Sequence, residues 1–193
     1  RPQKNRGKEN EMNAKHTFLF QYYGGGLRWI DAALLTNKDI VKDFIKFNHL
    51  KTGNIQSKSL NFPMCRVLSI YFPSIYQKVI KEVRVGDIKF DLAGLVQIQK
   101  LVAPRTIYKM NWEEINSVLD LMTQQNLEDS EEFGFLEEVK YQVENKITNK
   151  FFKDLKELPV QFLLPIFKMD DFTPEEIETQ KFSMRSTTFI HKR

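Results

Sequence analysis

The stretch Asn37-Lys-Asp-Ile-Val-Lys-Asp-Phe-Ile-Lys-Phe47 decides between an all-helical and a mixed fold for this chain. Its apolar residues follow a helical spacing: Ile40, Val41, Phe44, Ile45 and Phe47. Asn37 suits an N-cap, and Lys38, Lys42 and Lys46 recur at every fourth position on the outer side. We therefore predict a basic helix here, which ends at Lys51-Thr-Gly53-Asn54.

Similar spacing on both sides of this stretch predicts a helical chain. The expected helices cover 27–34, 63–70, 75–80, 90–102, 111–122, 130–147, 158–167 and a short segment from 173. Asn111 with Glu114 and Thr173 with Glu176 have the pattern of capping boxes, and Pro63 suits a helix start. Pro73 is expected to break or kink the helix that begins there, before the helix 75–80. Alternating patterns are short, with Phe18–Tyr22 the best candidate for a strand or extended anchor. The predicted fold is all-α, with about eight helices in two lobes.

Charge divides the chain more sharply than the net +4 suggests. Residues 38–110 hold thirteen basic and five acidic groups, giving +8, whereas residues 111–180 hold six basic and seventeen acidic groups, giving −11. Such asymmetry is found on surfaces that bind charged partners, and also on ordinary solvated surfaces. We predict a basic and aromatic N-terminal arm over 1–23, a basic helical lobe over 24–108, an acidic helical lobe over 109–180 and a basic C-terminal tail over 181–193.

Composition excludes several classes of protein. The apolar runs are too short for a membrane span, and the N-terminal residues have no apolar segment typical of a secretory signal. Cys65 is the single cysteine, and His16, His49 and His191 share no metal-ligand spacing. Gly24-Gly25-Gly26 lacks the residues of a phosphate-binding loop. We expect a soluble intracellular protein without a metal or cofactor, and not an enzyme.

The basic region interleaves cations with aromatic residues, a combination that neutralises phosphates while bases stack. The candidate RNA-binding residues are Arg66, Lys38, Lys42, Lys46, Tyr71, Lys78, Lys81, Arg84 and Arg105. Arg66 stands among apolar residues, where an arginine either pairs with a buried carboxylate or contacts a phosphate. Tyr71 suits a core position as well as a stacking platform.

Two segments carry a resemblance to a known family. Tyr23-Gly24-Gly25-Gly26 with Trp29, and later Cys65-Arg-Val-Leu-Ser-Ile-Tyr-Phe-Pro73, resemble nucleoproteins of segmented negative-strand viruses such as phleboviruses and tenuiviruses, and the related coat proteins of flexible filamentous plant viruses. The resemblance implies a two-lobed helical core with an RNA groove, a terminal arm that reaches a neighbouring subunit, and a role for Arg66 at the RNA. It also implies a location in the virion and host cytoplasm.

These observations lead to the hypothesis of a protein that coats single-stranded RNA without sequence specificity and forms homo-oligomers, as filaments or rings. Phe18, Phe20, Tyr22 and Tyr23 would make the subunit contact, unless the arm is only a disordered terminus. The alternative is a helical adaptor or assembly subunit of a larger complex, with no role in nucleic-acid binding.

Overall fold

The computed structural model describes residues 4–49, 52–90, 96 and 104–166. Its helices and strands are α1 (Lys4–Tyr23), α2 (Trp29–Ala33), η1 (Asn37–Asp39), β1 (Ile40–Val41), β2 (Phe44–Asn48), β3 (Ile55–Ser59), α3 (Phe62–Leu68), α4 (Pro73–Glu82), η2 (Val85–Asp87), α6 (Pro104–Ile107), α7 (Trp112–Gln124) and α8 (Glu131–Glu157). Most of the predicted helix 90–102, the capping box at Thr173 and the tail 181–193 lie outside the described residues.

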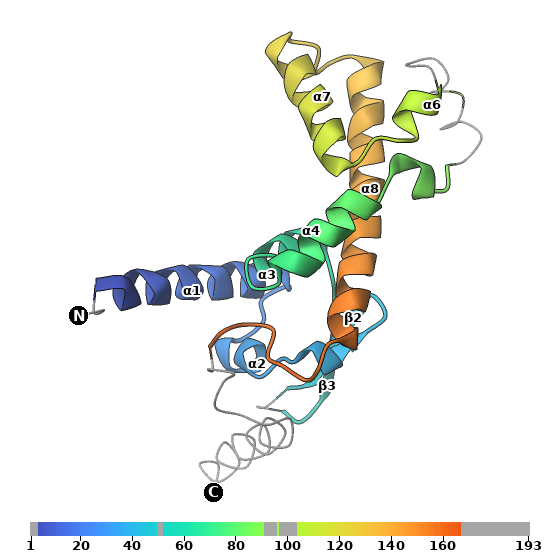
Figure 1. Cartoon of the computed structure of the whole chain (residues 1–193). Coiled ribbons are helices and arrows are strands. Elements are labelled where there is room, and N and C mark those ends of the chain that lie inside the picture. The colour runs from blue at the N-terminus through green and yellow to red at the C-terminus, as the bar shows by residue number, and fades with distance from the viewer. Residues whose placement is uncertain (1–3, 50–51, 91–95, 97–103, 167–193) are drawn as a thin grey trace, which may run out of the picture. The chain divides into compact units, whose positions relative to one another are not determined.

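The chain divides into two compact units (Figure 1). Unit 1 comprises residues 1–73 and 152–193, and unit 2 comprises residues 74–151. The divisions therefore fall at Pro73 and Phe151, away from the boundary near residue 108 that the charge pattern suggested. The distribution of charge along the chain need not match the division into compact units. Charged side chains remain in solvent whichever core their helix packs against.

After the short 3-10 helix η1, residues 40–48 form two strands and the turn between them, so the predicted basic helix is wrong. Strands β1, β2 and β3 make an antiparallel sheet in that order, and the protein is mixed α and β rather than all-α. Lys42 has a φ of 54°, which interrupts any helix and forms the turn between Val41 and Phe44. The Ile, Val and Phe residues that appeared to share a helix face are also those that favour strands.

The N-terminal arm was expected to be extended, with Phe18–Tyr22 as its best strand candidate, but the described part of it is helical. Residues Lys4–Tyr23 form helix α1, which packs against α2 and α3. His16, Thr17 and Phe20 are buried on one face of α1. The Tyr71 hydroxyl lies 2.8 Å from Nδ1 of His16 and donates to Oδ1 of Asn13 at 3.1 Å. Helical spacing places His16, Thr17 and Phe20 on one face of α1. A strand could not do this, because its successive side chains point to opposite faces.

Several predicted helix starts are confirmed. Asn61 caps α3 and precedes Pro63, and α4 begins at Pro73. Asn111 and Glu114 form the predicted capping box of α7. The Ser130 hydroxyl accepts from the backbone N–H of Phe133 at the start of α8. These local signals depend on side-chain–backbone bonds within one turn, so the sequence alone predicts them well.

The apolar segment 158–166 is not the predicted helix. Phe162 forms a β-bridge with Thr36, and the Leu163 N–H donates to the Leu35 carbonyl at 2.9 Å. Leu163 and Leu164 are buried in unit 1. Hydrogen bonding to residues far away in the sequence thus replaces helical bonds, and it brings the segment into the core.

Asn37 joins distant parts of unit 1 through its buried side chain. Its amide nitrogen donates to the carbonyls of Leu155, Leu158 and Pro159, at 3.0, 3.0 and 3.1 Å, and its Oδ1 accepts from the Gln161 N–H at 3.0 Å. Beside it, Lys38 Nζ donates to the carbonyls of Lys156 and Leu158 at 2.7 and 2.8 Å. The two residues therefore satisfy carbonyls that every helix leaves unpaired at its C-terminal end.

We predict that Asn37→Ala destabilises the protein by about 2–3 kcal/mol, because buried carbonyls and an N–H lose their partner. The midpoint of urea unfolding measures the change. Asn149→Ala, at an exposed position of α8, serves as the control and should shift the midpoint little. Equal shifts in the two variants would contradict a special role for Asn37.

Candidate nucleic-acid interface

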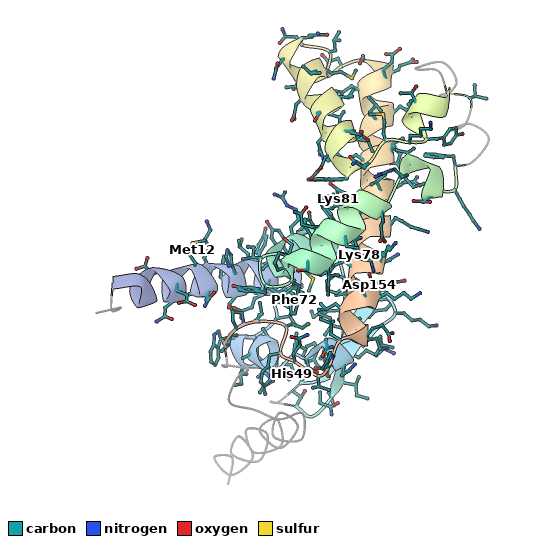
Figure 2. The ribbon with its side chains drawn as sticks, viewed as in Figure 1. Met12, His49, Phe72, Lys78, Lys81 and Asp154 are labelled. Carbon is teal, nitrogen blue, oxygen red and sulfur yellow. The ribbon has the colours of Figure 1, made fainter. Side chains whose placement is uncertain are left out.

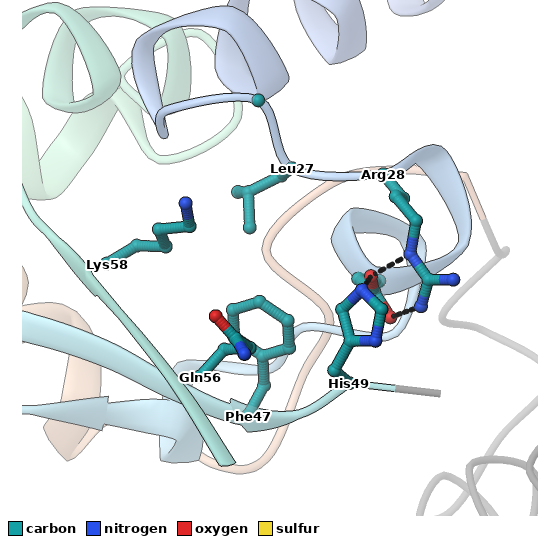
Figure 3. A pocket seen from close by; sticks show the side chains of 8 residues that line it. Leu27, Arg28, Phe47, His49, Gln56 and Lys58 are labelled. Atoms are coloured by element: carbon teal, nitrogen blue, oxygen red, sulfur yellow. Dashed lines mark hydrogen bonds and ion pairs between the residues drawn. The ribbon is translucent and has the colours of Figure 1, made fainter. Parts of the chain in front are cut away.

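A pocket of about 140 Å³ opens in unit 1, between the segment after α1 and the sheet (Figure 3). It is lined by Gly26, Leu27, Arg28, Asp31, Phe47, His49, Gln56 and Lys58. Phe47 pairs with Gln56 across β2 and β3, and Ile45 pairs with Lys58. Because side chains alternate between the faces of a strand, the register brings Phe47, Gln56 and Lys58 to the same face.

A buried carboxylate organises one wall of the pocket. The side chain of Asp31 is 1% exposed and accepts two hydrogen bonds from Arg28, at 2.6 Å from Nε and 2.8 Å from Nη2. His49 Nε2 lies 3.8 Å from the same carboxylate, and Thr52 Oγ1 lies 3.1 Å from His49 Nδ1. Bidentate pairing holds a guanidinium in one orientation, so Arg28 is a fixed donor at the pocket wall.

Lys58 supplies a second cation. Its Nζ donates to the Gly25 carbonyl at 2.9 Å, which leaves two of its three N–H donors for a ligand. Gly25 and Gly26 have φ values of 70° and 77°, a conformation that other residues rarely adopt. The glycine run is therefore the turn that places a backbone oxygen over the lysine.

The remaining walls suit a flat, partly polar group. Phe47 is half-buried, and the Gln56 side-chain amide makes no hydrogen bond to any residue that the structure describes. Drug-sized ligands occupy pockets of ~300–1,000 Å³, so this one would hold a single base or phosphate group. Two cations and a histidine face one carboxylate, which favours an anionic ligand over a cation.

The predicted RNA-binding residues of unit 1 do not gather around this pocket. Arg66 is exposed on α3 and pairs with no buried carboxylate of the described residues, and Tyr71 is hydrogen-bonded to α1. Lys38 caps α8, Lys42 lies in the β1–β2 turn, and Lys46 points from the sheet face opposite Phe47. The three lysines belong to three different elements rather than to one helix.

The other predicted RNA-binding residues belong to unit 2. Lys78 and Lys81 are exposed on α4, as Figure 2 shows. Arg84 precedes η2, and Arg105 lies within α6. The nine predicted residues thus divide between the two units, five in unit 1 and four in unit 2.

The predicted subunit-contact residues occupy opposite sides of α1. Phe18 is 65% exposed and Tyr22 is 68% exposed, one turn apart on the same face, and Tyr23 is also exposed. Phe20 is fully buried and belongs to the core of unit 1. Three of the four residues are therefore accessible to a partner.

The sequence analysis missed Arg28, Phe47, His49, Gln56 and Lys58 as a group. The signal lies in Ile55-Gln-Ser-Lys-Ser59, an alternating segment that follows Gly53-Asn54 and suits the second strand of a hairpin. Pairing that segment with Phe44–Asn48 places Gln56 and Lys58 on the Phe47 face.

The described residues give little support for metal binding, for a reactive cysteine or for a membrane span. They contain no group of three His, Cys, Asp or Glu side chains that could hold a metal ion. Burial raises the pKa of the Cys65 thiol far above its ordinary value, so this cysteine is a poor nucleophile. Within the described part of the chain, no helix has the length and apolar character needed to cross a membrane.

Comparisons with known proteins identify no relative: no family model, curated protein or solved structure matches the chain.

Tyr71 gives a prediction for alkaline pH. Burial raises the pKa of Tyr71 from 10.0 to about 12. A raised pKa means that the folded state favours the neutral phenol, so its contribution to stability is complete below pH 10 and is lost as the pH rises through 12. We expect the free energy of unfolding to decrease less over this range in Tyr71→Phe than in the wild type.

Urea unfolding at a series of pH values measures this difference. Tyr141→Phe is the control, because Tyr141 is exposed on α8, and it should follow the wild-type profile. An unchanged profile in Tyr71→Phe would show that the phenol does not ionise as the burial argument requires.

Proposed function

We propose that this protein binds single-stranded RNA without sequence specificity, as a nucleoprotein or coat protein does. One observation carries the proposal: Arg28, His49 and Lys58 converge with Phe47 and Gln56 at one pocket of unit 1. Cations neutralise the phosphate backbone, and an aromatic ring stacks any base, because every base has a π-face. The pocket can reach a base only when that base is unstacked, as in a single strand.

The charge of the two units supports the same location. Unit 1 holds nineteen basic and twelve acidic residues, giving +7, whereas unit 2 holds ten basic and thirteen acidic residues, giving −3. A positive unit attracts a polyanion over several ångströms before contact. The exposed Arg66, in the segment that resembles viral nucleoproteins, adds a further cation to unit 1.

Self-association is the second part of the proposal. The outer face of α1 presents Phe18 and Tyr22 to solvent, and neither ring contributes to the core of unit 1. Large aromatic rings are common anchors of protein interfaces. We therefore assign the subunit contact of an RNA-coating assembly to this face.

The same face also supports the alternative role of an adaptor in a larger complex. An adaptor would use Phe18 and Tyr22 to bind a different protein, and the pocket would then have no affinity for RNA. RNA binding by the purified protein therefore discriminates between the two functions.

We predict that Lys58→Ala weakens binding of labelled oligouridine and oligoadenine several-fold and lowers the salt dependence of binding by about 0.7 in log–log slope, the value of one lost phosphate contact. Phe47→Leu, which keeps apolar volume but removes the ring, should weaken binding about tenfold, since stacking contributes ~1–3 kcal/mol per base. Fluorescence anisotropy over a salt series measures both effects.

Lys153→Ala is the matched control, because this lysine is exposed on the part of α8 that belongs to unit 1 and does not line the pocket. It should change affinity by less than the pocket variants. Equal losses in Lys58→Ala and Lys153→Ala would place RNA outside the pocket, and no binding at low salt would reject the proposed function.

For self-association, we expect Phe18→Ala with Tyr22→Ala to reduce the assembly size measured by light scattering, without lowering the temperature of unfolding. The reason is that both side chains are exposed, so their loss removes contact with a neighbour and little of the core. Met12→Ala, also exposed on α1, is the control. An unchanged assembly size in the double variant would exclude this face as the contact.

A further inference from the structure

Strand β3 has one edge that pairs with no other strand of the described residues. In the order β1-β2-β3 it lies at the end of the sheet, and β2 is its only strand neighbour within the described residues. The edge of a sheet presents backbone N–H and C=O groups that can pair with another strand.

The hydrogen-bond register shows which groups face outward. The His49 N–H donates to the Asn54 carbonyl, and the Leu60 N–H donates to the Asp43 carbonyl. Because hydrogen-bonded pairs alternate along an antiparallel ladder, the backbone of Gln56 and Lys58 bonds to β2. The N–H and C=O groups of Ile55, Ser57 and Ser59 therefore point away from the sheet.

The sheet face opposite the pocket carries two exposed apolar side chains among polar ones. Phe44 is 41% exposed and Ile55 is 74% exposed on this outer face. Phe44 lies directly opposite Ser59 in the register, and Lys46 lies opposite Ser57. The edge strand thus carries two small serines between larger residues.

We propose that β3 pairs antiparallel with β3 of a second copy of this chain, with Ser57 opposite Ser57 at a two-fold axis. This register pairs Ile55 of each copy with Ser59 of the other. All three outward N–H groups and all three outward carbonyls of each copy then find partners. The two sheets become one continuous sheet of six strands.

The outer face becomes better packed in this arrangement. Ile55 of the second copy lies beside Ser59, two strand spacings from Phe44, or ~9.5 Å. Because serine is small, the isoleucine and phenylalanine side chains meet above it. The two most exposed apolar residues of this face therefore cover each other twice, once on each side of the axis.

Charge is also compatible with self-pairing. Lys58 of one copy faces Gln56 of the other, so no lysine lies opposite a lysine. The two Lys46 residues are separated by three strand spacings, or ~14 Å, with both copies of Ser57 between them. A different peptide could pair with the same backbone groups. Only a strand with the residue order of β3, however, places an isoleucine opposite each Ser59.

The pairing has a consequence for the pocket face. Gln56 and Lys58 of one copy become neighbours of Lys58 and Gln56 of the other, so two pockets lie on the same side of a single sheet. The inference does not rest on RNA binding, since it follows from the free edge and the outer face alone.

Cysteine cross-linking in the full chain tests the register. Ser57→Cys should form a disulfide-linked dimer under mild oxidation, because hydrogen-bonded residues at the axis have Cα atoms about 5.5 Å apart, within disulfide range. Ser59→Cys is the matched control, since its two copies would lie roughly 14 Å apart. The native Cys65 is buried and provides the background in both variants.

Ser57→Pro provides a second measurement. Its N–H points away from β2, so proline leaves the hairpin ladder intact while it blocks the edge. We expect this variant to lose the β3-linked dimer in light scattering and to keep the circular dichroism of the wild type. It should also keep RNA binding by each copy, so the outcome is separate from that of Lys58→Ala.

Three results would overturn the proposal. They are an absence of cross-linking in Ser57→Cys, equal cross-linking of Ser57→Cys and Ser59→Cys, and an unchanged assembly size in Ser57→Pro. A cross-link from Ser57→Cys to a co-purifying protein in place of its own copy would likewise show that a different occupant covers the edge.

Discussion

The buried amide of Asn37 is the interaction on which the rest of unit 1 depends. It connects η1, which leads directly into β1, with carbonyls at and just beyond the end of α8 and with the backbone of Gln161. A side chain with two donors and two acceptor lone pairs is suited to such a junction, because neither an aliphatic residue nor a carboxylate could satisfy both sets of groups. The position of the sheet, and therefore of the pocket, follows from this junction.

The register of the β2–β3 hairpin then decides which side chains line the pocket. Pairing Phe47 with Gln56 places an aromatic ring, an amide and Lys58 on one face, while Phe44, Lys46 and Ser57 occupy the other. A shift of one residue would exchange the two faces completely. The pocket and the outer face of the sheet are thus two results of one register. We propose RNA binding for the first and self-pairing for the second.

Arg28 and Asp31 show how burial changes the role of a charged residue. As a pair three residues apart they resemble an ordinary surface salt bridge, which contributes little. Here the carboxylate is enclosed, and the guanidinium is held by two hydrogen bonds at the pocket wall. The pair orients the N–H donors of Arg28 more than it stabilises the fold, because the cost of desolvating both charges offsets much of their attraction.

Local signals in the sequence determined the starts of α3, α4, α7 and α8, since capping side chains and prolines act within one turn of the backbone. They also determined the absence of a disulfide within the chain, because one cysteine cannot form one. The sequence patterns did not show that residues 40–48 form strands and a turn, that 4–23 form a helix and that 158–166 do not. Pairing with residues distant in sequence selected the strands and the extended segment, and packing against α2 and α3 buried one face of α1. The pocket could not be predicted for the same reason: its residues come from three short segments that only the hairpin register and the glycine turn bring together.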